Sequence, residues 1–95
     1  MPMMKIENVL QPGKTYSVDA EKFEAMRKAY LAHVPTSGIG ATPAEIQKAL
    51  IPSLPQALFP GGAKAGWWAK AVQLDQEAKG VIRRGPTAPV RLTRV

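Results

Sequence analysis

A chain of 95 residues is long enough for one small domain with a modest core and too short for two. It has no cysteine, which excludes a disulfide framework, thiolate catalysis and cysteine metal sites, and the expected location is cytoplasmic. The net charge of +6 is uneven: residues 1–63 hold six Lys/Arg against five Asp/Glu (+1), and residues 64–95 hold seven against two (+5).

The N-terminal part of the chain predicts an irregular arm followed by a helix. Residues 1–17 carry one short strand signal around residues 5–10 and a turn signal at Pro12-Gly13. Asp19 has the chemistry of a helix N-cap, and apolar residues follow it at spacings of three and four. We therefore expect a first helix over residues 20–33.

The segment "TPAE" predicts the start of a second helix. Thr42 can accept a hydrogen bond from the amide of Glu45 while Glu45 returns one, and Pro43 occupies the first helical position, where no N–H is needed. The helix is expected over residues 43–51, where prolines end it. The proline-rich and glycine-rich linker that follows carries apolar residues, which favours packing on the core.

A third helix is predicted over residues 64–79, with a glycine directly after it as the left-handed stop. At 100° per residue, Trp67 and Leu74 share an arc that we expect to be buried. Trp68 and Val72 lie on a flank of the same helix. That flank packs either on the linker or against a second subunit in a homodimer.

The C-terminal residues 81–95 predict two short strands joined by a glycine-containing loop. The ending "LDQEAKGVIRR…APVRLTRV" resembles the third helix and wing of winged-helix domains. The resemblance implies a mainly α fold with three helices and a small β-hairpin, in a single winged-helix-like domain over residues 1–95. It further implies that the second and third helices form a helix-turn-helix and that residues 81–95 form the wing.

A second resemblance is narrower. The string "FPGGAKAGWWAKAVQLDQEAKGVIRR" is similar to the core of a family of short bacterial proteins of unknown function, and the likeness extends weakly over most of the chain. The paired tryptophans followed by "VQLD" and "EAKG" carry this resemblance. It implies no activity, ligand or catalytic residue.

The basic C-terminal third favours a double-stranded DNA partner, because guanidinium groups pair bidentately with phosphate. The alternative is that the strand arginines only keep a sheet edge from aggregating. The candidate nucleic-acid contacts are Lys64, Lys70, Gln73, Arg83, Arg84, Arg91 and Arg94.

Catalytic chemistry finds little support in the sequence. His33 is the only histidine, and no His or carboxylate cluster has the spacing of metal ligands. No apolar stretch approaches the roughly 20 residues that cross a bilayer. We expect a non-enzyme without cofactor, metal or membrane anchor. The hypothesis that competes with DNA binding is a protein-interaction or homodimerisation domain of the same fold, in which Trp68 and Val72 form the interface.

Overall fold

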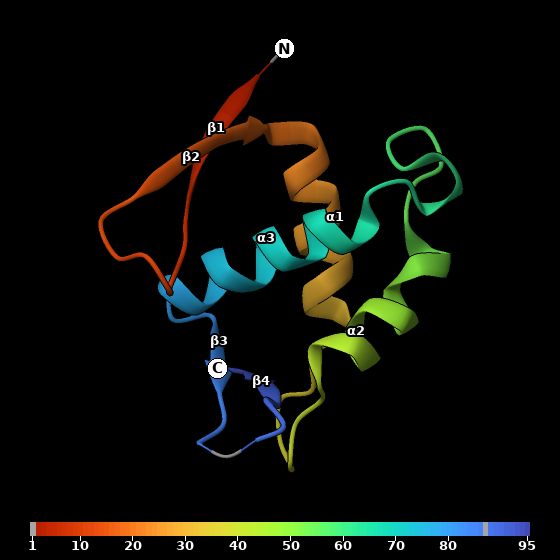
Figure 1. Ribbon diagram of the computed structural model, residues 1–95. Coiled ribbons are helices and arrows are strands. Elements are labelled where there is room, and N and C mark those ends of the chain that lie inside the picture. Colours follow the sequence, from red (N-terminus) through yellow and green to blue (C-terminus); the bar gives the residue numbers. More distant parts are fainter. Residues whose placement is uncertain (1, 87) are drawn as a thin grey trace.

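A computed structural model describes residues 2–86 and 88–95 and shows a small mixed α/β domain with two hairpins and three helices (Figure 1). Two short 3-10 turns, Ile51–Ser53 and Pro60–Gly62, interrupt the linker before the last helix. The helices and strands in chain order are β1 (Met3–Glu7), β2 (Thr15–Asp19), α1 (Ala20–Ala32), α2 (Pro43–Leu50), α3 (Ala65–Ala78), β3 (Ile82–Arg84) and β4 (Leu92–Arg94).

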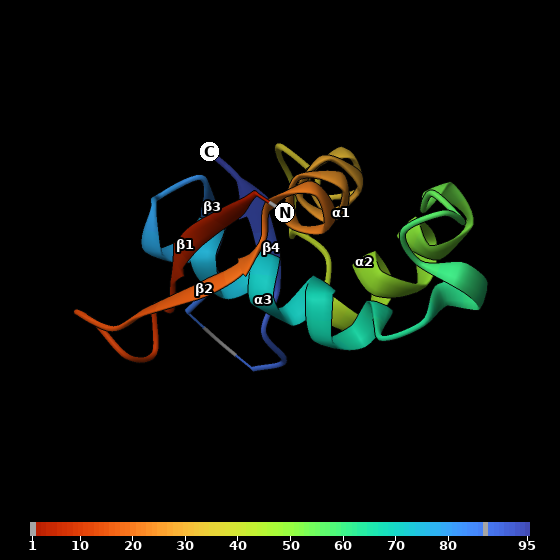
Figure 2. The ribbon, with the colours of Figure 1, turned by 90° about the horizontal axis from the view of Figure 1, so that it is seen from above.

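The core lies where α1, α2 and α3 pack against one another. Seen from above, α3 crosses the middle of the domain, and α1 and α2 both pack against it (Figure 2). Phe59 of the linker is buried, and its ring meets that of Trp68 edge to face with centroids 6.3 Å apart. The linker therefore packs on the core, as the sequence predicts. The largest fully buried side chains are Tyr30, Phe23, Phe59, Met26, Ile46, Leu50, Leu92, Gln73, Val72 and Asp75.

Local capping signals explain where the first two helices begin. The Asp19 carboxylate accepts from the Lys22 amide at 3.0 Å. Thr42 Oγ1 accepts from the Glu45 amide at 3.2 Å, and Glu45 Oε1 accepts from the Thr42 amide at 2.8 Å. Both caps and all three helices confirm the sequence expectations to within a residue or so at each end.

The N-terminal arm is more ordered than predicted. Instead of an irregular segment with one strand, β1 and β2 form an antiparallel hairpin in which Ile6 pairs with Tyr16. The loop end of the hairpin, next to this pair, is tied to α3: the Glu7 amide donates to Asp75 Oδ1 at 2.8 Å, and the Val9 amide donates to the Leu74 carbonyl at 3.2 Å. These tertiary bonds, absent from any local pattern, stabilise a hairpin that would be marginal alone.

The prediction of the buried face of α3 is correct for Leu74, which is 8% exposed, and wrong for Trp67. Trp67 is 59% exposed, whereas Trp68 is 9% exposed and Val72 is fully buried. The helix is covered by the other helices, by the linker and by β1, so more than one arc is enclosed. Polar side chains are buried among the apolar ones, and Gln73, Asp75 and Gln76 all have hydrogen-bond partners.

The C-terminal hairpin forms as expected but with shorter strands than predicted, Ile82–Arg84 and Leu92–Arg94. Ala41, just before α2, joins it through an isolated bridge to Leu92. Gly40 makes that approach feasible, because a Cβ at this position would lie 2.7 Å from the Leu92 carbonyl oxygen. No helix in the described part of the chain is long and apolar enough to cross a membrane.

Candidate nucleic-acid interface

The register of the C-terminal hairpin divides its arginines between two sides. Arg84 pairs with Leu92, and Arg83 pairs with Thr93. Because side chains alternate along a strand, Arg84 and Arg94 share the side of the buried Leu92 and point toward the helices. Arg83 lies on the opposite, outward side. The four arginines predicted to act together therefore do not share one face.

Arg84 is committed to an internal ion pair. Its Nε donates to Glu77 Oε1 at 2.7 Å and its Nη2 donates to Glu77 Oε2 at 3.0 Å, a bidentate arrangement between β3 and α3. Burial raises the pKa of Glu77, but the hydrogen bonds from Arg84 and Gln73 outweigh it and hold that pKa below its ordinary value of 4.5. The hydrogen bonds that Arg84 donates to Glu77 likewise raise the pKa of Arg84. Most of the charge of Arg84 is therefore compensated within the protein.

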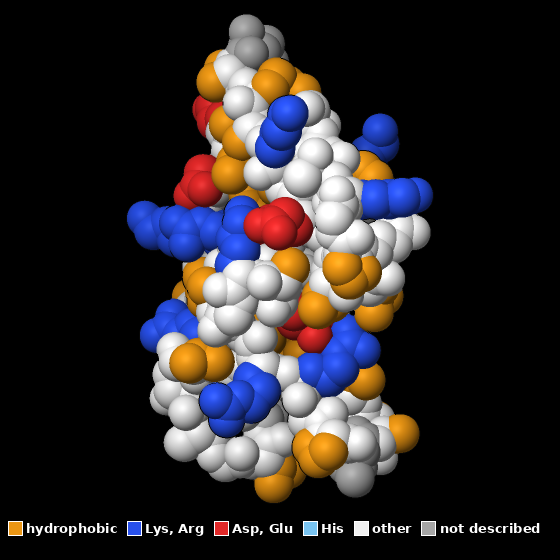
Figure 3. Space-filling view, turned by 90° about the vertical axis from the view of Figure 1, so that its left-hand side faces the viewer, with side chains coloured by type: hydrophobic (Ala, Val, Ile, Leu, Met, Phe, Trp, Pro, Cys, Tyr) orange, Lys and Arg blue, Asp and Glu red, His pale blue; other side chains and the backbone are white. Residues whose placement is uncertain are grey.

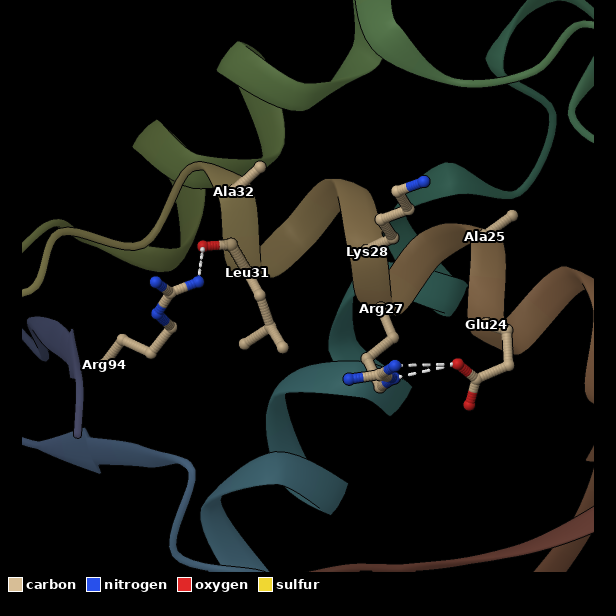
Figure 4. A pocket seen from close by; sticks show the side chains of 7 residues that line it. All are labelled: Glu24, Ala25, Arg27, Lys28, Leu31, Ala32 and Arg94. Atoms are coloured by element: carbon tan, nitrogen blue, oxygen red, sulfur yellow. Dashed lines mark hydrogen bonds and ion pairs between the residues drawn. The ribbon is translucent and has the colours of Figure 1, made fainter.

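Arg94 is directed at the end of α1 (Figure 4). Its Nη1 donates to the Leu31 carbonyl oxygen at 3.3 Å, where a helix C-terminus carries partial negative charge. The open hollow around it has a volume of about 580 Å³ and includes Arg27 and Glu24, which pair with each other at 2.9 Å. The basic side chains of this hollow therefore have an acidic side chain, Glu24, among them.

Arg83 and Arg91 lie differently. With Arg84 they line a cavity of about 480 Å³ on the hairpin, and none of its described lining residues is acidic. The structure shows no ion pair of Arg83 with another described residue, and Arg91 has only a long contact to Glu45, with Nη1 and Oε1 3.7 Å apart. A backbone hydrogen bond holds Arg91 in place across the loop: the Gly85 amide donates to the Arg91 carbonyl oxygen at 2.9 Å.

The remaining predicted contacts are scattered along α3. Lys64 precedes the helix in a left-handed conformation, with φ +56°, and the 14-residue helix separates it by about 21 Å from the hairpin. Gln73 is 1% exposed and donates to Glu77 Oε2 at 3.0 Å, so its prediction as a base-reading side chain is wrong. Lys70 is exposed, but it lines a different groove, between α3 and the N-terminal hairpin.

The predicted protein interface is also corrected. Trp68 and Val72 belong to the core and offer no surface to a second subunit. Trp67, which the sequence analysis assigned to the core, is the exposed tryptophan and stands edge to face with Trp68 at a centroid distance of 5.0 Å. Helical spacing alone could not separate the two, since the linker packs against only one of them.

Basic side chains on the face that carries both hairpins form several separate groups, and acidic side chains lie beside some of them (Figure 3). Within the described residues there is no group of three or more His, Cys, Asp or Glu side chains that could hold a metal ion. The geometry therefore provides one compact cationic element, the outward side of the C-terminal hairpin, in place of a continuous basic face.

These observations define a small mixed α/β domain with a basic C-terminal hairpin. Residues 3–92 match a family of unknown function, DUF6958, and the chain belongs to that family. This agrees with the resemblance that the paired tryptophans and the "VQLD" and "EAKG" strings carry. No curated protein and no solved structure matches the chain.

Proposed function

We propose that this chain is a winged-helix module that binds double-stranded DNA through the outward side of its C-terminal hairpin. The order of its elements supports the winged-helix assignment: α1 and α2 are followed by α3, and α3 leads through Gly80 directly into β3 and β4. The bridge between Ala41 and Leu92 adds a short third partner to this wing and ties it to the start of α2.

The single observation that carries the DNA proposal is the cavity on the wing. Arg83, Arg84 and Arg91 line it together with Gly85, and none of its described lining residues is acidic. Phosphate oxygens suit such a surface, because a guanidinium group offers several donors in a fixed plane. Arg83 contributes most, since Arg84 already binds Glu77.

Base-specific contacts are few in this arrangement. Gln73 is buried and bonded to Glu77, and Lys70 is the one predicted contact that α3 leaves exposed within its own length. Contacts to phosphate position a protein without specifying a sequence. We therefore expect affinity to vary little between duplexes of different sequence and to depend strongly on salt.

The salt dependence of duplex binding tests the proposal, with fluorescence anisotropy as the measurement between about 50 and 200 mM salt. Each phosphate contact contributes about −0.9 to the log–log slope, so Arg83→Ala should make the slope shallower by about 0.9 and the Arg83→Ala/Arg91→Ala double variant by about 1.8.

Arg27→Ala is the matched control, because it removes the same charge from α1, where Glu24 already pairs with Arg27. It should leave the slope unchanged. The proposal fails if wild-type protein does not bind a duplex at about 50 mM salt, or if Arg27→Ala alters the slope as much as Arg83→Ala.

A further inference from the structure

The groove between the N-terminal hairpin and α3 is separate from the wing and is lined by residues of both elements. We propose that it binds a small planar aromatic anion. This inference goes beyond DNA binding and does not depend on it. The groove has a volume of about 370 Å³, near the lower end of the usual range for small-molecule sites.

The hairpin and α3 are joined at one end of this groove and diverge toward the other. The joined end is fixed by hydrogen bonds from the Glu7 amide to Asp75 and from the Val9 amide to the Leu74 carbonyl. From Leu74 the lining of α3 continues backward through Ala71 to Trp67, one helical turn at a time. The space between the hairpin and α3 is therefore wedge-shaped, and it is closed at the end near Leu74.

The walls of the wedge are apolar and aromatic. Ile6 and Tyr16 are directly paired and lie on the same side of the hairpin as Val18, and all three line the groove. Trp67 lines the opposite wall and is 59% exposed, although a tryptophan gains more from burial than almost any other side chain. Two aromatic side chains on opposite walls favour a flat, unsaturated ligand that both can contact.

The charge of the groove selects an anion. Lys70 lies on α3 between Trp67 and Leu74, is exposed, and makes no ion pair with a described residue. Glu7 is the acidic residue of the lining, but strand alternation places its side chain on the other side of the hairpin from Ile6. A carboxylate beside Lys70 would gain a charge-assisted hydrogen bond while its ring system fills the apolar wedge.

The experiment is an NMR titration of the ¹⁵N-labelled protein with naphthalene-2-carboxylate, compared with the uncharged naphthalene-2-carboxamide. The indole N–H of Trp67 and the amides of Ser17 and Ala71 should shift with the carboxylate, whereas the indole of the buried Trp68 should shift less. The carboxylate should bind more tightly than the amide by about two- to fivefold, within the range for one solvent-exposed charged contact.

Variants separate the two parts of the inference. Lys70→Met should remove the preference for the carboxylate and leave amide binding unchanged, whereas Trp67→Ala should weaken both probes. Lys28→Met, on the outer side of α1, is the control and should change neither. Trp67→Phe keeps an aromatic wall and should retain the charge preference, which guards against a folding effect of the alanine variant.

Three results would overturn the inference. One is the absence of any shift at the groove up to about 5 mM probe, a concentration that corresponds to a binding free energy of only about 3 kcal/mol. Another is equal affinity for the carboxylate and the amide. The third is that the Trp67 signal shifts with protein concentration alone, which would assign this surface to a second copy of the chain.

Discussion

The ion pair between Arg84 and Glu77 offers the sharpest test of how the C-terminal hairpin is attached to the helices. Arg84→Met preserves most of the aliphatic length of the side chain and removes both hydrogen bonds to the carboxylate. The Glu77 side chain is only 4% exposed, so it would remain largely enclosed with the Gln73 amide as its principal partner. The substitution therefore isolates the cost of leaving this carboxylate without its cation.

The expected loss is about 2 kcal/mol in the free energy of unfolding. Removing one partner of a fully buried pair costs about 3–5 kcal/mol, and the Arg84 side chain is 35% exposed, which reduces the figure because water screens the pair. For a domain of this size the loss corresponds to a fall of roughly 8–16 °C in melting temperature. Glu77→Gln removes the charge instead and should cost less, so the double variant should recover part of the Arg84→Met loss.

Urea denaturation followed by tryptophan fluorescence measures these differences, with Arg83→Met as the control. Arg83 is adjacent in the strand but points outward and makes no ion pair with a described residue, so its loss should stay within about 0.5 kcal/mol. The reasoning is refuted if Arg84→Met and Arg83→Met are equally stable, or if the double variant is no better than Arg84→Met.

Three further predictions concern the acid stability of the Arg84 variant and the urea stability of variants at two glycines and at the two tryptophans. The pKa of Glu77 is lower in the folded protein than its ordinary value of 4.5, so its contribution to stability is present above pH 4.5 and is lost as the pH falls through the folded pKa. Arg84→Met should make this loss of stability smaller in acid denaturation curves. Gly40→Ala should lower the free energy of unfolding in urea by roughly 2 kcal/mol or more, because the new Cβ would lie 2.7 Å from a backbone oxygen. Gly38→Ala should lower it by only about 1 kcal/mol, because Gly38 has a similar φ but open space around its Cβ position. Trp68→Ala should cost about 3–5 kcal/mol and Trp67→Ala less than about 1 kcal/mol in the same assay, and equal losses would contradict the assignment of the two side chains.

Features that depend on neighbouring residues were predictable from the sequence. Thr42 and Glu45 satisfy each other's orphan groups within one turn, and Gly80, at φ +76°, ends α3 as predicted. The same holds for the C-terminal hairpin, whose two strands and loop follow from a short apolar pattern and Gly85. The chain order of three helices and a C-terminal hairpin was therefore accessible without coordinates.

Features that depend on distant partners were not predictable. The N-terminal hairpin is fixed by Asp75, which lies 68 residues from Glu7, and the alternation of Tyr16 and Val18 is too short to establish a strand alone. Helical periodicity predicts one buried side for α3, but the linker and β1 cover additional sides of that helix. This is why Trp67 and Trp68 exchanged roles and why Gln73 was assigned to the surface.

The candidate site shows the same division. Residue types and net charge identified a basic hairpin, but they could not show that Arg84 and Arg94 are directed inward to Glu77 and to the end of α1. That distinction follows from strand register, which sets the side on which each arginine lies. It leaves Arg83 and Arg91 as the cations that the wing can present to a partner.

A chemical-shift titration of the ¹⁵N-labelled protein with a short DNA duplex tests DNA binding by the wing most directly. Amides of Arg83, Gly85, Arg91 and Thr93 should shift at about 50 mM salt and return toward their free positions as salt is raised, with little change on the outer side of α1. Shifts that gather around Arg27 and Arg94 instead, or no shifts at low salt, would contradict binding through the outward side of the wing.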